Sequence, residues 1–238
     1  MILDTNALSA IGEMRTDYVR GKLQREDLNE DPVQQFAFWF DEACRAGLPE
    51  PNAVSLATVG ADGRPLVRTV LVKHFDAAGF IFFTNLESTK ATQIAQNPNV
   101  SLLFPWLLLE RQVIINGTAA RLPLVDVAKY FLTRPRDSRV AAWVSQQSRV
   151  VSARRLLEAK FDEMMRKFGD GEIPVPSFWG GFRVAPRTIE FWQGGTHRLH
   201  DRFQYRRSAP GAAWSSPPRS SCCSRCSRAA PESRSLAR

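Results

Sequence analysis

Basic side chains are concentrated in the segment 191–202, FWQGGTHRLHDR, which contains two His, two Arg and one Trp beside a pair of glycines. Arg198, His200 and Arg202 alternate along it, and alternate residues of a strand share one face. Three basic side chains on one face repel one another unless an anion or a polar ligand lies among them. This segment therefore predicts a role in binding or catalysis rather than a purely structural one.

A phenol, a guanidinium and a hydroxyl recur at helical spacing further toward the N-terminus. Tyr130 and Arg134 are four residues apart, so they share a face of the helix expected there, and Ser138 follows in the next turn or loop. Three such groups suit a phosphate monoester. A polar helix end before Pro135 has the same appearance, and the spacing alone leaves both interpretations open.

Two other segments carry cations that could bind phosphate. Arg68 and Lys73 bracket an apolar strand, and their odd spacing places them on opposite faces. They are either solvated charges at the rim of a sheet or anion contacts for different ligands. The segment 84–90 runs from a strand end into a helix start, where free N–H groups beside Lys90 form a phosphate site. An ordinary helix capped by Ser88 has the same pattern.

The elements that must position these residues follow from the hydrophobic periodicity. Asp31 and Pro32 are typical of a helix start, and apolar residues recur at helical spacing from there to Gly47. After this helix the sequence predicts several strands in close succession. Such strands usually pair as antiparallel neighbours and close into a barrel. The expected fold class is mainly β with flanking helices (α+β). Strands are expected at 53–59, 65–74, 80–84, 100–106, 111–120, 178–184, 188–192 and 198–205, and helices at 88–97, 124–133 and 152–168.

Composition gives little reason to expect a nucleic-acid partner. The 238 residues are 44% hydrophobic, which suits one domain with a real core. Residues 206–238 contain seven Arg and one Glu, so they carry +6 of the net charge of +8. From Ser208 onward the chain is rich in Ser, Arg, Pro, Ala and Cys. Such a segment cannot bury enough apolar surface to offset its chain entropy, and disorder is expected.

Several other classes of protein are not indicated. No apolar run approaches the ~20 residues of a membrane span, and the first residues lack a secretory pattern, so a cytoplasmic protein is expected. Cys223 and Cys226 have CxxC spacing, but no second pair and no nearby His completes a zinc site, so no metal is expected. Cys44 is expected to be a small buried hydrophobe. No Rossmann or P-loop fingerprint occurs.

Taken together, these segments resemble the pyridoxamine/pyridoxine 5′-phosphate oxidase family over residues 15–205. The segments that carry the resemblance are 101–106 (SLLFPW), 110–112, 134–138 (RPRDS), 176–183 (PSFWGGFR), 191–195 and 198–202. The resemblance implies an FMN-binding split barrel that works as a homodimer with FMN between the subunits. It also implies oxidation of pyridoxamine or pyridoxine 5′-phosphate to pyridoxal 5′-phosphate, by hydride transfer to FMN, which O2 reoxidises with release of H2O2.

The resemblance further implies roles for particular residues. The implied FMN contacts are Arg68, Val70, Leu71, Lys73, Phe83, Thr84, Lys90, Gln112, Gln147, Ser148, Trp192 and Arg202. The implied contacts of the substrate phosphate are Lys73, Tyr130, Arg134 and Ser138. Arg198 and His200 would address the pyridine ring as the catalytic residues, and Arg15 and Tyr18 belong to a segment similar to the family's lid. The domains would be a lid at 1–30, the split barrel at 31–206 and a disordered tail at 207–238.

Two departures from the family pattern have structural consequences. Thr89 stands where related sequences often carry Arg, which weakens the expected contact with the FMN phosphate. Trp214 is near the place where the family's chain closes with a short strand, but residues 215–238 read as unrelated sequence. A frameshift or a wrong terminus is the leading interpretation, and the missing strand bears on stability and dimer packing.

Three other functions compete with the oxidase interpretation. A flavin reductase of the same fold would need a nicotinamide donor, and it has no reason to share the set Tyr130, Arg134 and Ser138 together with Arg198 and His200. A non-catalytic binder of pyridoxal phosphate or FMN would bind ligand without turnover. Nucleic-acid binding through the Arg-rich tail would disappear on truncation after Arg206.

Overall fold

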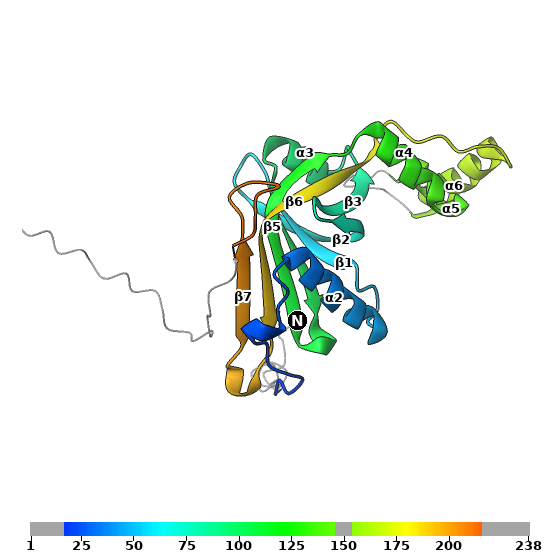
Figure 1. Ribbon diagram of the computed structural model, residues 1–238. Helices are drawn as coiled ribbons and strands as arrows, with labels where there is room; N and C mark the ends of the chain where they lie inside the picture. Colours follow the sequence, from blue (N-terminus) through cyan, green and yellow to red (C-terminus); the bar gives the residue numbers. More distant parts are fainter. Residues whose placement is uncertain (1–16, 146–153, 216–238) are drawn as a thin grey trace, which may run out of the picture.

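Seven antiparallel strands form the centre of the molecule in the computed structural model, which describes residues 17–145 and 154–215 (Figure 1). Their order in the sheet is β3-β2-β1-β4-β5-β6-β7, and β3 also pairs with β6, so that six strands close into a barrel and β7 extends it. The expected β-barrel fold with flanking helices is confirmed. The strands are β1 (Ala53–Val59), β2 (Pro65–Asp76), β3 (Gly79–Asn85), β4 (Asn99–Trp106), β5 (Arg111–Arg121), β6 (Trp179–Gln193) and β7 (Asp201–Arg206).

Strand β6 is one continuous strand of 15 residues, and the expectation of two strands at 178–184 and 188–192 is wrong. One edge of β6 pairs with β5 along its length, and this pairing continues through the expected gap at Ala185 and Pro186. The register shifts beside Gly117, and a proline without an N–H group is tolerated at such an irregularity. The other edge of β6 is divided, because its first half pairs with β3 and its second half with β7.

Helix α2 (Pro32–Arg45) fills one side of the barrel, as its apolar stripe predicts. The Asp31 side chain accepts a hydrogen bond from the Val33 N–H at 2.8 Å, which is the expected N-cap. Phe36 and Trp39 are fully buried in the main hydrophobic core. Cys44, on the opposite side of the same helix, is exposed, so its expected burial is wrong.

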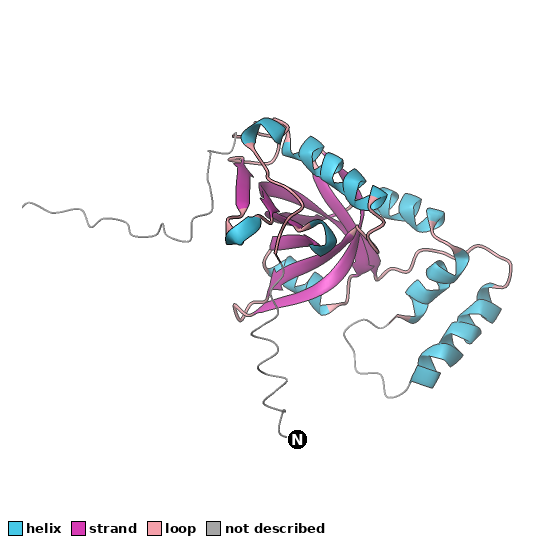
Figure 2. Cartoon of the chain, turned by 90° about the horizontal axis from the view of Figure 1, so that it is seen from below, coloured by secondary structure: helices cyan, strands magenta, loops and turns pink. Residues whose placement is uncertain are grey.

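Helices α4 (Leu124–Thr133), α5 (Arg136–Val144) and α6 (Arg154–Phe168) lie to one side of the barrel and enclose a second core (Figures 1 and 2). The bounds of α4 are those expected. Helix α5 was not expected, since Pro135 was read as an end, whereas its fixed φ also suits the residue before a helix start. Helix α6 lies within the range expected for it, 152–168.

The chain between β6 and β7 does not form the strand that was expected at 198–205. Thr196–Arg198 is a short 3-10 helix, η3, and β7 begins only at Asp201. A Cβ at Gly195 would lie 2.1 Å from the Leu199 carbonyl oxygen, so the loop folds back too tightly for any residue other than glycine. The predicted alternation of Arg198, His200 and Arg202 on one strand face is therefore wrong.

Order continues past β7 into the segment expected to be disordered. Arg207 is buried, and its guanidinium lies 4.5 Å from the Trp214 ring centroid. Ser215 forms an isolated antiparallel bridge with Arg206. The ordered region thus reaches Ser215, while residues 216–238, with the expected frameshifted tail and its cysteines, lie outside the described residues. The other elements are α3 (Thr89–Gln96), η1 (Arg25–Asp27) and η2 (Leu107–Leu109).

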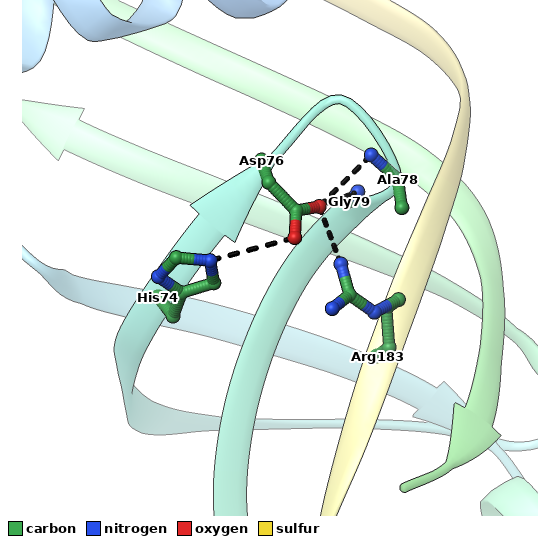
Figure 3. Close-up of polar contacts among 5 residues, drawn as sticks. All are labelled: His74, Asp76, Ala78, Gly79 and Arg183. Atoms are coloured by element: carbon green, nitrogen blue, oxygen red, sulfur yellow. Dashed lines mark hydrogen bonds and ion pairs between the residues drawn. The ribbon is translucent and has the colours of Figure 1, made fainter. Parts of the chain in front are cut away.

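A carboxylate ties the β2–β3 turn to β6, where the barrel closes (Figure 3). Asp76 accepts hydrogen bonds from the backbone N–H groups of Ala78 at 2.8 Å and Gly79 at 3.1 Å. It also pairs with the Arg183 guanidinium of β6, and His74 Nε2 lies 3.4 Å from its other oxygen. Burial acts to raise the pKa of Asp76, but the hydrogen bonds from Arg183 and the turn outweigh it, so this pKa lies below its ordinary value.

We expect Asp76→Asn to destabilise the barrel at neutral pH and to lose its effect in acid. A carboxyl whose pKa is depressed on folding stabilises the protein above the unfolded value of about 3.9, and this contribution disappears as pH falls through the folded pKa. The loss at pH 7 should be about 1 kcal/mol, the usual net worth of a hydrogen bond. Urea unfolding at several pH values between 7 and 3 measures it.

The matched control for that experiment is Asp162→Asn, at an exposed position on α6. Its free energy of unfolding should follow the wild-type pH dependence throughout. If Asp76→Asn also follows the wild-type curve, the carboxylate does not fasten the turn to β6.

Candidate active site

A pocket of about 760 Å³ opens between β2, β3, the start of α3 and the junction of α4 with α5. Its lining includes ten of the residues predicted to contact cofactor or substrate, namely Arg68, Val70, Leu71, Lys73, Phe83, Thr84, Lys90, Tyr130, Arg134 and Ser138. These residues come from five separate elements and from the junction after α4. The fold therefore assembles one concave site from segments that are far apart in the sequence.

Cations predominate at the β2–α3 side of this pocket. The Arg68 guanidinium donates hydrogen bonds to the Leu56 carbonyl at 3.1 Å and to the Thr58 hydroxyl at 2.6 Å, which fixes its position. Lys90 Nζ lies 3.1 Å from the Thr84 hydroxyl. Burial, and then the nearby charge of Arg68, lower the pKa of Lys90. Two desolvated cations that disfavour each other's charge are stabilised when an anion enters between them.

Ser88 precedes α3 as expected, but its side chain does not cap the helix. Its hydroxyl donates instead to the Asn85 carbonyl at 2.7 Å. Thr89, which stands in place of the family's usual Arg, is the first residue of α3 and is exposed. The cationic side chains that line this side of the pocket are accordingly those of Arg68 and Lys90.

Arg68 and Lys73 line the same pocket, although a regular strand would place them on opposite faces. The pairing of β2 with β3 shifts register between Val72 and His74, so Lys73 lies at an irregularity. Thr69, Val70 and Leu71 between them line it as well, so the pocket does not decide whether the two cations lie on opposite faces, and that stays a prediction. The register of a strand cannot be read from the spacing of two residues when a bulge lies between them.

Aromatic rings form the opposite side of the pocket, around Arg134. The Phe83 and Tyr130 rings stack with centroids 3.9 Å apart, and the Trp179 ring lies nearly parallel to Phe83 at 5.2 Å. The Arg134 guanidinium lies 5.0 Å from the Trp179 centroid. Arg134 Nη1 is buried without a hydrogen-bond partner, and burial lowers the pKa of this residue. A buried guanidinium N–H without a partner among the described residues is costly, and an acceptor that binds beside it would satisfy it.

Trp179 was not predicted as a site residue. It lies within the segment 176–183 that carried part of the family resemblance, yet an aromatic residue at the start of an apolar strand is ordinarily a core residue. Thr69, Thr133 and Pro135 also line the pocket without having been predicted. The register of β3 against β6, which pairs Asn85 with Trp179, brings Trp179 to the pocket, and no local signal predicts it.

A second group of predicted residues lies at the far end of β6, and we call it the β7 cluster: Tyr18, Gln112, Trp192, Arg198, His200 and Arg202. Trp192 is the cross-strand partner of Gln112 on β5 and of Arg202 on β7. The His200 ring lies 4.7 Å from Trp192 and 5.4 Å from Tyr18. The lining of the 760 Å³ pocket includes none of these residues.

Hydrogen bonds orient the polar members of the β7 cluster. The Gly195 N–H donates to His200 Nδ1 at 3.1 Å, so a neutral His200 carries its proton on Nε2 and presents a donor there. The Arg202 guanidinium pairs with the buried carboxylate of Glu190 at 2.7 Å. Arg198 is exposed and has a φ of 61°, an uncommon conformation for a residue other than glycine that often marks functional sites.

The pocket and the β7 cluster are separated by the length of β6. Trp179, at the start of the strand, lines the pocket, and Trp192, thirteen positions later, belongs to the cluster. An extended strand advances about 3.3 Å per residue, which gives a separation of up to about 40 Å. In Figure 1, α4 lies at the upper right and the loop before β7 at the bottom. One chain does not bring all the predicted residues together.

The other predictions concern three further site residues, metal binding and membrane spans. Arg15, Gln147 and Ser148 lie outside the described residues. Within the described part of the chain, no group of three His, Cys, Asp or Glu side chains could hold a metal ion. No helix in that part is long and apolar enough to cross a membrane.

Comparison with known proteins identifies the family. A family model described as pyridoxamine 5′-phosphate oxidase matches residues 40–167, and one described as the pyridoxine 5′-phosphate oxidase C-terminal dimerisation region matches residues 179–217. Relatives named pyridoxine/pyridoxamine 5′-phosphate oxidase include those of Yersinia enterocolitica, 56% identical over 84% of this chain and 92% of the relative, and of Rippkaea orientalis, 57% identical over 82% and 92%.

Solved structures agree with that assignment. PhzG of Burkholderia lata, solved in complex with tetrahydrophenazine-1-carboxylic acid, has a TM-score of 0.76 and 28% identity over 82% of this chain and 96% of its own. A pyridoxamine 5′-phosphate oxidase-related, FMN binding protein of Nostoc punctiforme shares the fold, with a TM-score of 0.63 and 17% identity over 79% and 97%. The chain belongs to the pyridoxamine 5′-phosphate oxidase family.

Proposed function

We propose that this protein oxidises pyridoxamine or pyridoxine 5′-phosphate to pyridoxal 5′-phosphate, with FMN as hydride acceptor and O2 as the final oxidant. The observation that carries the proposal is the pocket that half-buried cations line together with stacked aromatic rings, and in which Arg134 Nη1 has no hydrogen-bond partner among the described residues. The alcohol substrate gives the aldehyde directly, and the amine substrate takes up water and releases ammonia. In both reactions O2 is reduced to H2O2.

The residues of the pocket fit FMN and a second phosphate together. Arg68, Lys90 and the Thr84 hydroxyl supply cations and a donor for the phosphate of FMN. Arg134 and Tyr130 lie on the other side, with Ser138 and Lys73 also in the lining, and these residues would hold the phosphate of the substrate. FMN, when bound, accepts the hydride and transfers two electrons to O2.

A second copy of the chain would complete this site. The β7 cluster carries Trp192, Arg202 and Gln112, yet it lies up to about 40 Å from the pocket of its own chain. The matched dimerisation region, 179–217, contains most of that cluster. We infer that the β7 cluster of one subunit covers the pocket of the other, in a two-fold arrangement that gives two equivalent sites.

In that arrangement Arg198 and His200 would address the pyridine ring of the substrate. Hydride transfer depends on holding the substrate carbon close to its acceptor, and a positioned guanidinium and imidazole provide that constraint. His200 presents an Nε2 donor, because Nδ1 accepts from the Gly195 N–H. Tyr18 packs edge-on against both Trp192 and His200, which is consistent with a lid over the ring.

Two other functions use the same cofactor pocket. A flavin reductase would accept electrons from a nicotinamide, but a half-buried Arg134 whose Nη1 has no acceptor among the described residues has no use in that reaction. A non-catalytic binder of FMN or pyridoxal phosphate would fit the pocket without turnover.

The purified protein should be yellow, and it should consume O2 and release H2O2 when pyridoxamine 5′-phosphate is added. An absorbance spectrum, an oxygen electrode and a peroxide assay measure these properties. NADH and NADPH serve as controls and should support no comparable oxygen consumption. Turnover with a nicotinamide alone would indicate a reductase, and a yellow protein without turnover on either phosphate ester would indicate a binder.

Arg134→Ala should raise KM for pyridoxamine 5′-phosphate while the protein retains FMN. A charge-assisted contact is worth about 1.5–3 kcal/mol, which corresponds to a roughly ten- to hundredfold increase. Steady-state kinetics and the flavin-to-protein ratio measure the two effects. Lys129→Ala, at an exposed position on the same helix, is the matched control and should leave KM unchanged. An unaltered KM in Arg134→Ala removes this residue from the phosphate site.

Mixed dimers of Arg134→Ala and Arg198→Ala should recover activity that neither variant has alone. Arg198→Ala should lose most turnover, by about 100-fold, and keep FMN, because it disturbs only the position of the substrate ring. If each site takes Arg134 from one subunit and Arg198 from the other, a mixed dimer contains one intact site and one doubly substituted site. If the subunits pair at random, about half of the dimers are mixed. About a quarter of all sites are then intact.

Activity of the mixture is measured at substrate concentrations below the wild-type KM, where each of the two variants alone is slow. Arg187→Ala, exposed on β6, replaces Arg198→Ala in the control mixture and should give the activity expected from simple averaging. If co-expressed Arg134→Ala and Arg198→Ala give no more activity than the average of the parents, the two residues belong to one subunit and the proposed arrangement is wrong.

A further inference from the structure

We propose that Trp179 is a positioning residue that gives the site its selectivity for phosphorylated substrates, an inference that rests on the proposed function. Trp179 is 7% exposed and is the first residue of β6. It lines the pocket together with Arg134 and Tyr130, the two side chains placed at the substrate phosphate. Its ring contacts both of them, so it can act on phosphate recognition without contacting the phosphate itself.

The first contact holds the Arg134 guanidinium. Its central carbon lies 5.0 Å from the Trp179 centroid and 5.8 Å from that of Phe131. Within the described residues, no carboxylate forms an ion pair with Arg134. An aromatic face attracts a cation electrostatically without using its N–H groups, whereas a carboxylate would occupy them and neutralise the charge. Arg134 thus stays in place, and its buried Nη1 has no acceptor among the described residues.

The second contact aligns the phenol of Tyr130. The Tyr130 ring is within 7° of parallel to Trp179, with centroids 6.2 Å apart, and stacks on Phe83 at 3.9 Å. Burial raises the pKa of Tyr130, partly opposed by Arg134, so the phenol keeps its proton and remains a donor. The three rings therefore form a rigid support for two phosphate donors at once.

Gly181 shows that the chain makes room for this ring support. A Cβ at Gly181 would lie 2.8 Å from the Phe83 ring, and equally close to the Leu122 side chain. Only glycine at this position lets Phe83 lie flat beside Trp179. The register of β3 against β6 pairs Phe83 with Gly181 directly, so the same strand pairing that closes the barrel also builds the support.

The consequence is a specific pattern of kinetic effects. Without the indole, Arg134 and Tyr130 gain freedom that binding of the phosphate must remove, while the pyridine ring is held elsewhere, by the β7 cluster. Loss of Trp179 should therefore weaken phosphorylated ligands and leave their unphosphorylated counterparts unaffected. A merely structural role would weaken both equally.

The test uses the FMN-loaded enzyme and the variants Trp179→Leu and Trp179→Phe. Inhibition constants of pyridoxal 5′-phosphate and pyridoxal give the selectivity without turnover of the unphosphorylated compound. Trp179→Leu should reduce the ratio of the two constants roughly tenfold and raise KM for pyridoxamine 5′-phosphate by a similar factor, with kcat little changed. Trp179→Phe keeps a flat ring and should lie between Trp179→Leu and wild type.

Two further variants show whether the effect passes through Arg134. Arg134→Ala with Trp179→Leu should lose less selectivity than the product of the two single effects, because the indole then has no guanidinium to hold and acts only through Tyr130. Trp143→Leu is the matched control, since this tryptophan of α5 bonds to the Pro174 carbonyl and is absent from the pocket lining. It should reduce thermal stability without changing selectivity.

The outcomes separate this inference from the proposed function. A wild-type enzyme that does not oxidise pyridoxamine 5′-phosphate refutes the function itself. If the wild type is active and Arg134→Ala loses selectivity, but Trp179→Leu and Trp179→Phe keep the wild-type ratio, Trp179 is not a positioning residue. Equal weakening of pyridoxal 5′-phosphate and pyridoxal in the Trp179 variants also overturns the inference. If Trp179→Leu does not fold, the ratio of inhibition constants in Trp179→Phe tests the inference. An unchanged ratio in that variant overturns it.

Discussion

The continuous pairing of β6 with β5 is the constraint on which the other features depend. Because that edge stays paired through Pro186, the opposite edge of β6 can serve two partners, β3 near Trp179 and β7 near Trp192. The β3 pairing closes the barrel and positions the pocket. The β7 pairing carries the second group of basic residues away from it. A break in β6 at the proline would free the two halves to rotate, and the distance between the clusters would no longer be fixed.

The electrostatics of the pocket favour ligand binding over stability. Burial lowers the pKa values of Lys90 and Arg134, which means that the empty protein holds these charges at a cost. Elsewhere in the described chain some half-buried cations pair with carboxylates, as Arg202 does with Glu190, whereas the buried Arg207 lies against the Trp214 ring. Aromatic faces hold Arg134 as well, and a bound phosphate would supply the missing charge and acceptors. The convergence of Arg68, Lys90 and Arg134 on one pocket supports a site built for an anion rather than an incidental group of basic residues.

Local patterns in the sequence predict those elements whose stability is local. The bounds of α4, the N-cap of α2 and the first five strands follow from periodicity and capping residues. Features that depend on distant pairing were not predictable in this way: the continuity of β6, the register shift at Lys73 and the tight turn at Arg198. The candidate residues were found largely through family resemblance, since spacing alone left each motif with a plausible structural explanation. Trp179 was missed because only the β3–β6 register, a long-range property, brings it beside Arg134.

The position of the two clusters on one rigid strand also explains why association and site formation should be coupled. A flexible linker would let one chain fold its basic loop over its own pocket, but β6 is paired on both edges over most of its length and cannot bend back on itself. The cluster must therefore meet a pocket on another molecule or remain unused. A two-fold axis satisfies this requirement twice with one kind of interface, because each subunit offers one pocket and one cluster. In the proposed arrangement the dimer is a geometric consequence of how the barrel closes, and the active site would inherit its symmetry.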